Sequence, residues 1–225
     1  MRLLLITVLF VYNFLQSQSI IVHYELLPKQ IQTTGEMNEK ARQVVNIINN
    51  HKQNFILKAN SKGYIFNDDE KTLSDFEQKI RVLQKATVLI NDFYYDGSSQ
   101  KLYKLKENLK IEITNKQSWQ LAKETKNING YTCYKATCEW EYQTRSGNSG
   151  IRSAIAWYTP QIPFSYGPNG FQNLPGLILE IEQNGNKLVA KKIELFKHNL
   201  NISFPKMRTV DEEKYNEKLL ENSPY

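Results

Sequence analysis

The sequence predicts an α+β, mainly β fold: one curved antiparallel sheet with two helices on its concave side. Two features of the 225-residue chain carry this prediction. Short turn signals separate pairs of segments in which apolar and polar residues alternate, and two other stretches show helical spacing instead. Because each predicted strand has one apolar face, a single sheet curved over one core accommodates all of them.

Four turn signals predict β-hairpins, one Asn-Ser-Lys-Gly segment and three Asn-Gly or Asp-Gly pairs, in which both residues tolerate positive φ. The turns are Asn60–Gly63, Asp96-Gly97, Asn129-Gly130 and Asn184-Gly185. Their flanking segments are Phe55–Ala59 with Tyr64–Phe66, Asp92–Tyr95 with Lys101–Leu105, Leu121–Ile128 with Tyr131–Tyr142, and Leu177–Glu182 with Lys187–Leu195.

Helical spacing occurs twice between the strands. Ala41, Val44, Val45 and Ile48 follow an i, i+3, i+4, i+7 pattern, and Thr33-x-x-Glu36 is a candidate capping box. Leu73, Phe76, Ile80 and Leu83 repeat the pattern. The second helix is expected to lie across the concave face of the sheet.

The N-terminus is typical of a secretory signal peptide, because Arg2 precedes a largely apolar run from Leu3 to Leu15 and a small-residue site at Ser17-Gln18-Ser19. We therefore expect a signal peptide at residues 1–19, one domain at 20–205 and a charged tail at 206–225, with a short helix near 211–220. The mature chain has no run of membrane-spanning length. We expect the exported chain to be located in the periplasm, at the outer membrane or outside the cell. Because export separates it from nucleic acid, its basic charge does not indicate a nucleic-acid partner.

Known catalytic and metal-binding motifs are not found in the sequence. His23, His51 and His198 belong to separate segments without ligand spacing, so neither a metal nor another cofactor is expected. Cys133 and Cys138 are five positions apart on one predicted strand, about 16 Å from each other, which is too far for a disulfide. Packing is the favoured role of Cys133, with a reactive thiol as the alternative.

The segment between Tyr158 and Leu177 cannot be a central strand, because four prolines cannot donate ladder hydrogen bonds. Pro175 and Gly176 fit the middle of a type II turn, with positive φ at Gly176. The loop has two interpretations: an aromatic binding rim, or a plug that closes one end of the sheet. The rim would consist of Trp157, Tyr158, Phe164, Tyr166 and Phe171.

The second half of the chain resembles the GLPGLI family, exported proteins typical of the Bacteroidetes. The residues that carry the resemblance are Cys133, Lys135, Ala136, Ala156, Trp157, Ile162, Pro163, Gly167, Pro168, Leu174, Pro175, Gly176, Leu177 and Ile178, with Asn173 in place of the usual first Gly. The resemblance implies an envelope protein without an assigned activity. The order of elements is similar to the half-barrel of periplasmic lipoprotein carriers, an analogy of fold alone.

Three functions are consistent with these features. The first is non-enzymatic binding of an apolar ligand, a lipid or an extended polypeptide in the concave sheet. The second is a structural or assembly partner of an outer-membrane complex, with no ligand cavity. The third and weakest is an enzyme that uses the Cys133 thiol.

Overall fold

The computed structural model describes most of the chain. The described residues are 19–32, 35, 37–50, 52–69, 78–82, 85, 90–106, 108–114, 117–143, 149–203 and 205–221. The predicted signal peptide lies almost entirely outside them, as do His51, Thr33 and Glu36.

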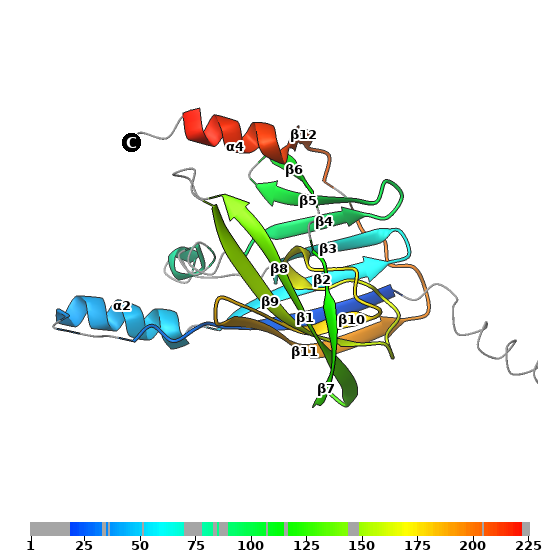
Figure 1. Cartoon of the computed structure of the whole chain (residues 1–225), viewed down its shortest axis with the longest axis horizontal. Helices are drawn as coiled ribbons and strands as arrows, with labels where there is room; N and C mark the ends of the chain where they lie inside the picture. Colours follow the sequence, from blue (N-terminus) through cyan, green and yellow to red (C-terminus); the bar gives the residue numbers. More distant parts are fainter. Residues whose placement is uncertain are drawn as a thin grey trace, which may run out of the picture.

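One open sheet of twelve strands dominates the structure, in the order β12-β6-β5-β4-β3-β2-β1-β11-β10-β9-β8-β7 (Figure 1). All neighbours pair antiparallel except β12 and β6, which are parallel. The strands are β1 (Ser19–Leu27), β2 (Gln53–Asn60), β3 (Gly63–Asp68), β4 (Asp92–Asp96), β5 (Lys101–Lys106), β6 (Leu109–Ile113), β7 (Gln120–Ile128), β8 (Tyr131–Gln143), β9 (Ser149–Thr159), β10 (Leu177–Gln183), β11 (Asn186–Phe196) and β12 (Arg208–Asp211).

All four predicted hairpins are confirmed: β2–β3, β4–β5, β7–β8 and β10–β11. At the turn between β7 and β8, Asn129 and Gly130 both have positive φ, at 52° and 84°. Asn184 and Gly185 repeat this at the β10–β11 turn, with 54° and 79°. Two consecutive residues with positive φ are typical of the type I′ turn, whose twist matches that of the flanking strands.

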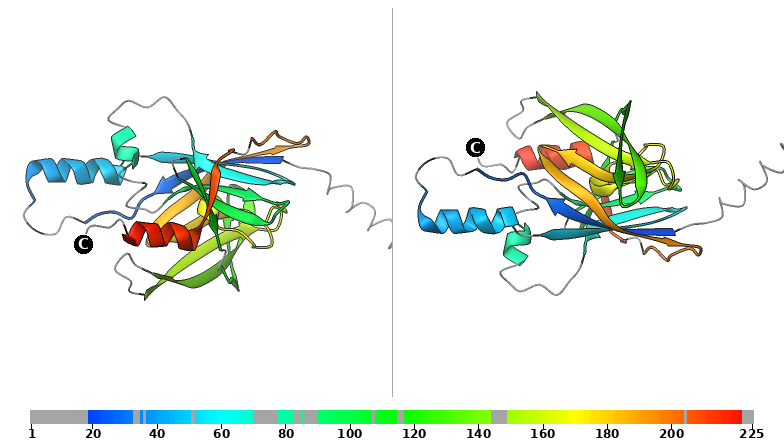
Figure 2. Two further views of the ribbon diagram at one scale, coloured as in Figure 1. Left: turned by 90° about the horizontal axis from the view of Figure 1, so that it is seen from above. Right: turned by 90° about the horizontal axis from the view of Figure 1, so that it is seen from below.

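The sheet curves around one apolar core, as Figure 2 shows from above and below. Alternate residues of the central strands supply it: Tyr24 in β1, Phe55 in β2 and Phe66 in β3 have no exposed surface. The Tyr24 hydroxyl donates a hydrogen bond of 2.6 Å to the carbonyl oxygen of Ile178 in β10. Strands far apart in sequence are thereby joined through the core.

Helix α2 (Glu39–Asn50) confirms the first predicted helix. Its cap is Asn38, whose side-chain oxygen accepts a hydrogen bond of 2.9 Å from the backbone N–H of Ala41. The predicted placement on the concave face is not confirmed, because α2 projects beyond the ends of β1 and β2 (Figures 1 and 2). We call residues 28–52, which connect β1 to β2 and contain α2, the arm.

Of the second predicted helix, residues 78–82 are helical, and the part before them lies outside the described residues. The C-terminal segment contributes β12 and helix α4 (Glu212–Glu221), which packs against β12 and β6. Across the described ranges, no helix is long and apolar enough to cross a membrane.

Candidate functional site

The segment between β9 and β10, residues 160–176, lies inside the curve of the sheet (Figure 2); we call it the inner loop. It contains the short 3-10 helix η2 (Pro168–Gly170). Tyr166 packs on Tyr64 and Tyr95, with ring centroids 4.9 and 5.6 Å apart. Phe171 packs on Trp119 and Trp140, at 6.0 and 5.9 Å. The inner loop therefore contacts both sides of the curved sheet, β3 and β4 on one side and β8 on the other.

Polar groups fix the inner loop in this position. The Gln117 side chain donates to the carbonyl oxygen of Gly170 and accepts from the backbone N–H of Gln172, each at 3.1 Å. The Trp119 indole N–H donates to the Gln172 carbonyl oxygen at 2.8 Å. Backbone groups that would be costly to bury unpaired are thus satisfied within the core.

The turn at Pro175 differs from the predicted type II turn. The backbone N–H of Gly176 donates to the carbonyl oxygen of Leu174 at 2.7 Å, which closes a three-residue γ-turn centred on Pro175. The N–H of Leu177, which a type II turn would direct to Leu174, instead donates to Ile162 at 3.0 Å. The positive φ predicted at Gly176 is confirmed at 148°. Asn173 also has positive φ, at 69°, a conformation that Asn tolerates better than most residues other than Gly.

A small cavity opens where the inner loop meets the end of the β10–β11 hairpin. Its apolar wall consists of Leu26, Ile90, Phe171, Ile181 and Leu188. Asn169, Gln183, Asn186 and Lys187 complete the lining. The cavity has about 10 Å³ of free volume, room for about one water molecule. A lipid or another large apolar ligand does not fit there.

Three carboxamide side chains border this cavity. The Asn186 oxygen accepts a hydrogen bond of 2.8 Å from the backbone N–H of Lys29, which fixes the orientation of the amide. The Asn169 oxygen accepts from the backbone N–H of Asn91 at 3.1 Å. Gln183 is half-buried, and its side chain makes no hydrogen bond with any described residue. Carboxamides both donate and accept, as sugar hydroxyl and acetamido groups also do.

Gln183 and Asn186 were not among the residues singled out from the sequence, although a signal for them exists. They flank the Asn184-Gly185 turn and form the last pair of the hairpin, Gln183 opposite Asn186. Ile181 and Leu188 pair two residues earlier and share their face, because side chains alternate along a strand. The alternation therefore places two carboxamides directly beside a buried apolar pair.

The five aromatic residues predicted as a binding rim lie in three places. Trp157 is on the outer face, where the Lys126 ammonium lies 4.3 Å from its ring centroid and pairs with Glu180 at 2.7 Å. Tyr158 is 5% exposed and packs near Tyr134, with ring centroids 6.1 Å apart. The remaining three belong to the inner loop: Phe164 stacks near Tyr166 with centroids 6.0 Å apart, and Phe171 lines the cavity.

The other residues singled out with the sequence motif serve mainly as packing. Ala136, Ala156, Ile162, Leu174, Leu177 and Ile178 are at most 1% exposed. Gly167 lies against Ile178, where an added Cβ would come within 2.7 Å of that side chain. Lys135 pairs with Glu124 at 2.8 Å on the outer face. Pro163 and Pro175 are exposed, and Pro168 is buried in η2.

Cys133 and Cys138 are both free and buried, as the strand separation predicts. Burial raises the pKa of the Cys133 thiol to about 11 and that of Cys138 to about 12. Both thiols are therefore protonated at neutral pH, which disfavours nucleophilic or metal-binding chemistry because these require the thiolate.

Two histidines are described, and they lie apart. His23 is hydrogen-bonded to Glu194 at 3.1 Å and lies 4.0 Å from Asp69, whereas His198 packs on Phe196. In the part of the chain that the structure covers, no group of three or more His, Cys, Asp or Glu side chains could hold a metal ion.

Comparison with known proteins identifies one family. The matching family model, PNGase F-II N, is described as "N-glycanase peptide, N-terminal domain" and covers residues 32–217. Two similar solved structures are those of PNGF-II in the P21 and C2 space groups, each with a TM-score of 0.52 and 15% sequence identity. Each alignment covers 92% of this chain and 33% of the solved chain, so this chain spans about a third of their length. No curated protein matches.

The resemblance to the GLPGLI family is therefore wrong, because the matching family is a different one. In this chain the central motif forms a tight turn followed by re-entry into the sheet at Leu177. The same family match contradicts the predicted function, which is the binding of an apolar ligand or, as the alternative, a role as assembly partner in an outer-membrane complex. The matching family is described by the name N-glycanase, and the solved structures of similar fold are those of PNGF-II.

Proposed function

This chain belongs to the family of the N-terminal domain of N-glycanase peptide, and we propose that it recognises N-glycosylated polypeptide. The family match through residues 32–217 is the observation that carries this proposal. The proposal concerns recognition alone, because the chain covers only 33% of the solved N-glycanase chain that shares its fold.

The chemistry of the cavity supports a carbohydrate ligand. Sugars present hydroxyl and acetamido groups that both donate and accept hydrogen bonds, and C–H surfaces that pack on apolar side chains. The border formed by Gln183, Asn186 and Asn169 matches the first property, and the wall formed by Phe171 and Ile181 matches the second.

The sheet architecture supports a ligand at the margin rather than in the centre. We propose that the curved sheet acts as a half-barrel whose interior is occupied by its own inner loop. Phe171 and Leu174 are 4% and 1% exposed, so the loop is part of the core. A bulky glycan then binds where the inner loop meets the hairpin end, close to the root of the arm.

Export is part of the same proposal. The signal-peptide features of residues 1–19 direct the chain out of the cytoplasm. N-linked glycans are carried by the surface loops of secreted proteins, so an exported domain is in the compartment where it can meet them. The proposed partner is thus a glycoprotein, and the domain that meets it includes β12 and α4 beyond residue 205.

Binding to one glycoprotein before and after removal of its N-glycans tests the proposal. A denatured N-glycosylated protein is immobilised, half of the surface is treated with an N-glycanase, and the purified mature chain is passed over both halves. We expect binding to the untreated half and at least tenfold weaker binding to the treated half. Equal binding to both halves, or binding to neither, contradicts the proposal.

A further inference from the structure

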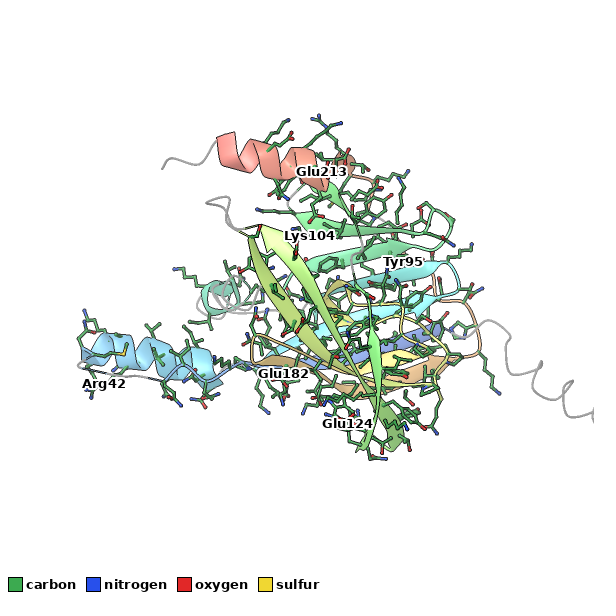
Figure 3. All side chains as sticks on the ribbon, viewed as in Figure 1. Arg42, Tyr95, Lys104, Glu124, Glu182 and Glu213 are labelled. Carbon is green, nitrogen blue, oxygen red and sulfur yellow. The ribbon has the colours of Figure 1, made fainter. Side chains whose placement is uncertain are left out.

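We propose that the cavity at the end of the β10–β11 hairpin receives the acetamido group of an N-acetylhexosamine. This inference rests on the proposed function and assigns the sugar that the domain recognises. Figure 3 shows Glu182, the neighbour of Gln183, at this end of the sheet near the root of the arm.

The inner wall of the cavity suits a methyl group. Leu26, Ile181 and Leu188 come from the adjacent strands β1, β10 and β11, and each is at most 3% exposed. Phe171 closes the wall from the inner loop. The cavity offers about 10 Å³ to a small group and is partly open to solvent, so the methyl enters it while the sugar ring stays outside.

The border of the cavity suits the amide of the same acetamido group. Since the Asn186 oxygen is already bonded to the Lys29 N–H, the Asn186 NH₂ is the part of that amide left to donate, here to the ligand carbonyl oxygen. The oxygen of the unbonded Gln183 side chain can accept from the ligand N–H. A sugar that carries a hydroxyl in place of the acetamido group offers neither the methyl nor this pair of hydrogen bonds.

The wall is fixed before a ligand arrives. Asn169 adopts positive φ, at 54°, and its side-chain oxygen accepts from the Asn91 backbone N–H. The Phe171 N–H donates to the Pro168 carbonyl oxygen at 3.1 Å, which closes η2 beside the cavity. A preformed site loses less entropy on binding, so a small contact can still select its ligand.

Two disaccharides that differ at the 2-position provide the first test. N,N′-diacetylchitobiose carries acetamido groups where cellobiose carries hydroxyls. Titrated into the folded chain and followed by calorimetry, N,N′-diacetylchitobiose is expected to bind, with cellobiose at least about tenfold weaker. Equal affinity for the two sugars, or no binding of N,N′-diacetylchitobiose at millimolar concentration, overturns the proposal.

A matched pair of substitutions locates the site. Asn186→Asp keeps the oxygen that accepts from Lys29 and removes the NH₂ donor, so the fold is retained while affinity falls about fivefold or more. Asn127→Asp is the control, because Asn127 accepts from the Gly130 N–H at 3.0 Å at the other Asn-Gly turn. The control is expected to bind the sugar as the unaltered chain does.

Gln183→Ala, which removes the proposed acceptor, is expected to weaken N,N′-diacetylchitobiose binding by a similar factor. Unfolding curves of all three variants verify that the sheet is intact. If Asn186→Asp and Gln183→Ala both bind like the control, the sugar binds elsewhere and the proposal is wrong. In that case glycan-dependent binding to the immobilised glycoprotein would still support the proposed function. If the chain instead binds N,N′-diacetylchitobiose in the cavity but shows no glycan-dependent binding to the glycoprotein, the sugar site stands and the proposed function is wrong.

Discussion

The inner loop and the arm are both long excursions from the sheet, and they make opposite use of their apolar residues. The inner loop places Ile162, Phe171 and Leu174 in the core, each at most 4% exposed. The arm leaves Ile31 and Val44 more than 40% exposed, and α2 projects away from the strands (Figure 3, where Arg42 marks the helix). Length and apolar content therefore do not decide whether a connection becomes part of the core.

The inner loop and the arm differ in how many hydrogen bonds join them to the rest of the sheet. The inner loop is held by Gln117 and Trp119, and by backbone bonds to Ile162 and Tyr166 from the first residues of β10. The arm has contacts of its own, such as the paired hydrogen bonds between Ile31 and Asn49, and its root is bonded to the sheet through the Lys29 N–H and Asn186. We infer that the inner loop unfolds only with the whole sheet, whereas α2, beyond the root of the arm, can open by itself.

Glycine substitutions give the largest expected contrast. Gly176 and Gly35 both have positive φ, but a Cβ at Gly176 would meet the Thr159 carbonyl oxygen at 2.1 Å, whereas one at Gly35 meets no atom of the described residues within 4 Å. Gly176→Ala should cost about 4 kcal/mol, the sum of about 1 for the φ penalty and about 3 for the steric conflict. Gly35→Ala should cost about 1 kcal/mol.

Thermal unfolding measures this difference. The midpoint should fall by about 8–16 °C for Gly176→Ala and by about 2–4 °C for Gly35→Ala. Equal shifts for the two variants would show that the steric contact at Thr159 is relieved at little cost and that the inner loop is less tightly held than the structure implies.

Truncation of apolar side chains should also destabilise the protein more in the inner loop than in the arm, with a smaller difference in unfolding free energy. Leu174→Ala empties a site that is 1% exposed and should cost about 3 kcal/mol. Val44 is 45% exposed in α2, and Val44→Ala should change the free energy of unfolding by less than about 0.5 kcal/mol. Denaturant unfolding with a common m-value gives both numbers. A cost above about 2 kcal/mol for Val44→Ala would mean that the arm packs against a surface that the structure does not show.

The cap of α2 provides the smallest and most local effect. Asn38→Ala removes the hydrogen bond to the Ala41 N–H and should cost the helix about 1 kcal/mol. Since α2 can open by itself, its amide exchange should become about fivefold faster while the global free energy of unfolding stays unchanged. An equal loss of global stability would instead join the arm and the sheet into one cooperative unit.

The sequence specifies the hairpins and the first helix well, because those signals are local. Asn129-Gly130 and Asn184-Gly185 determine their turns through backbone preference alone. β1 and β9 are central strands that no turn signal of this kind introduces, and β12 pairs in parallel with β6 across about 100 residues of chain. Such long-range pairing is decided by tertiary packing, which periodicity does not report.

The candidate site illustrates the same limit. The aromatic residues of residues 160–176 are visible in the sequence, but whether they line a rim or fill a core depends on their neighbours Tyr64, Tyr95 and Trp140. The carboxamides of Gln183 and Asn186 become candidate binding groups only because Phe171 and Ile90, which are distant in sequence, line the same cavity. The family assignment fails for a related reason, since the Leu174–Ile178 motif reports a turn and a strand rather than an activity.

Chemical-shift mapping with a short N-glycosylated peptide tests the central claim most directly, that ligand recognition occurs at the margin between the inner loop and the β10–β11 hairpin. The account predicts perturbed amide signals at Asn169, Phe171, Gln183 and Asn186, with α2 unaffected, and no perturbation by the same peptide without its glycan. Perturbations confined to α2, or identical for the glycosylated and bare peptides, would contradict it.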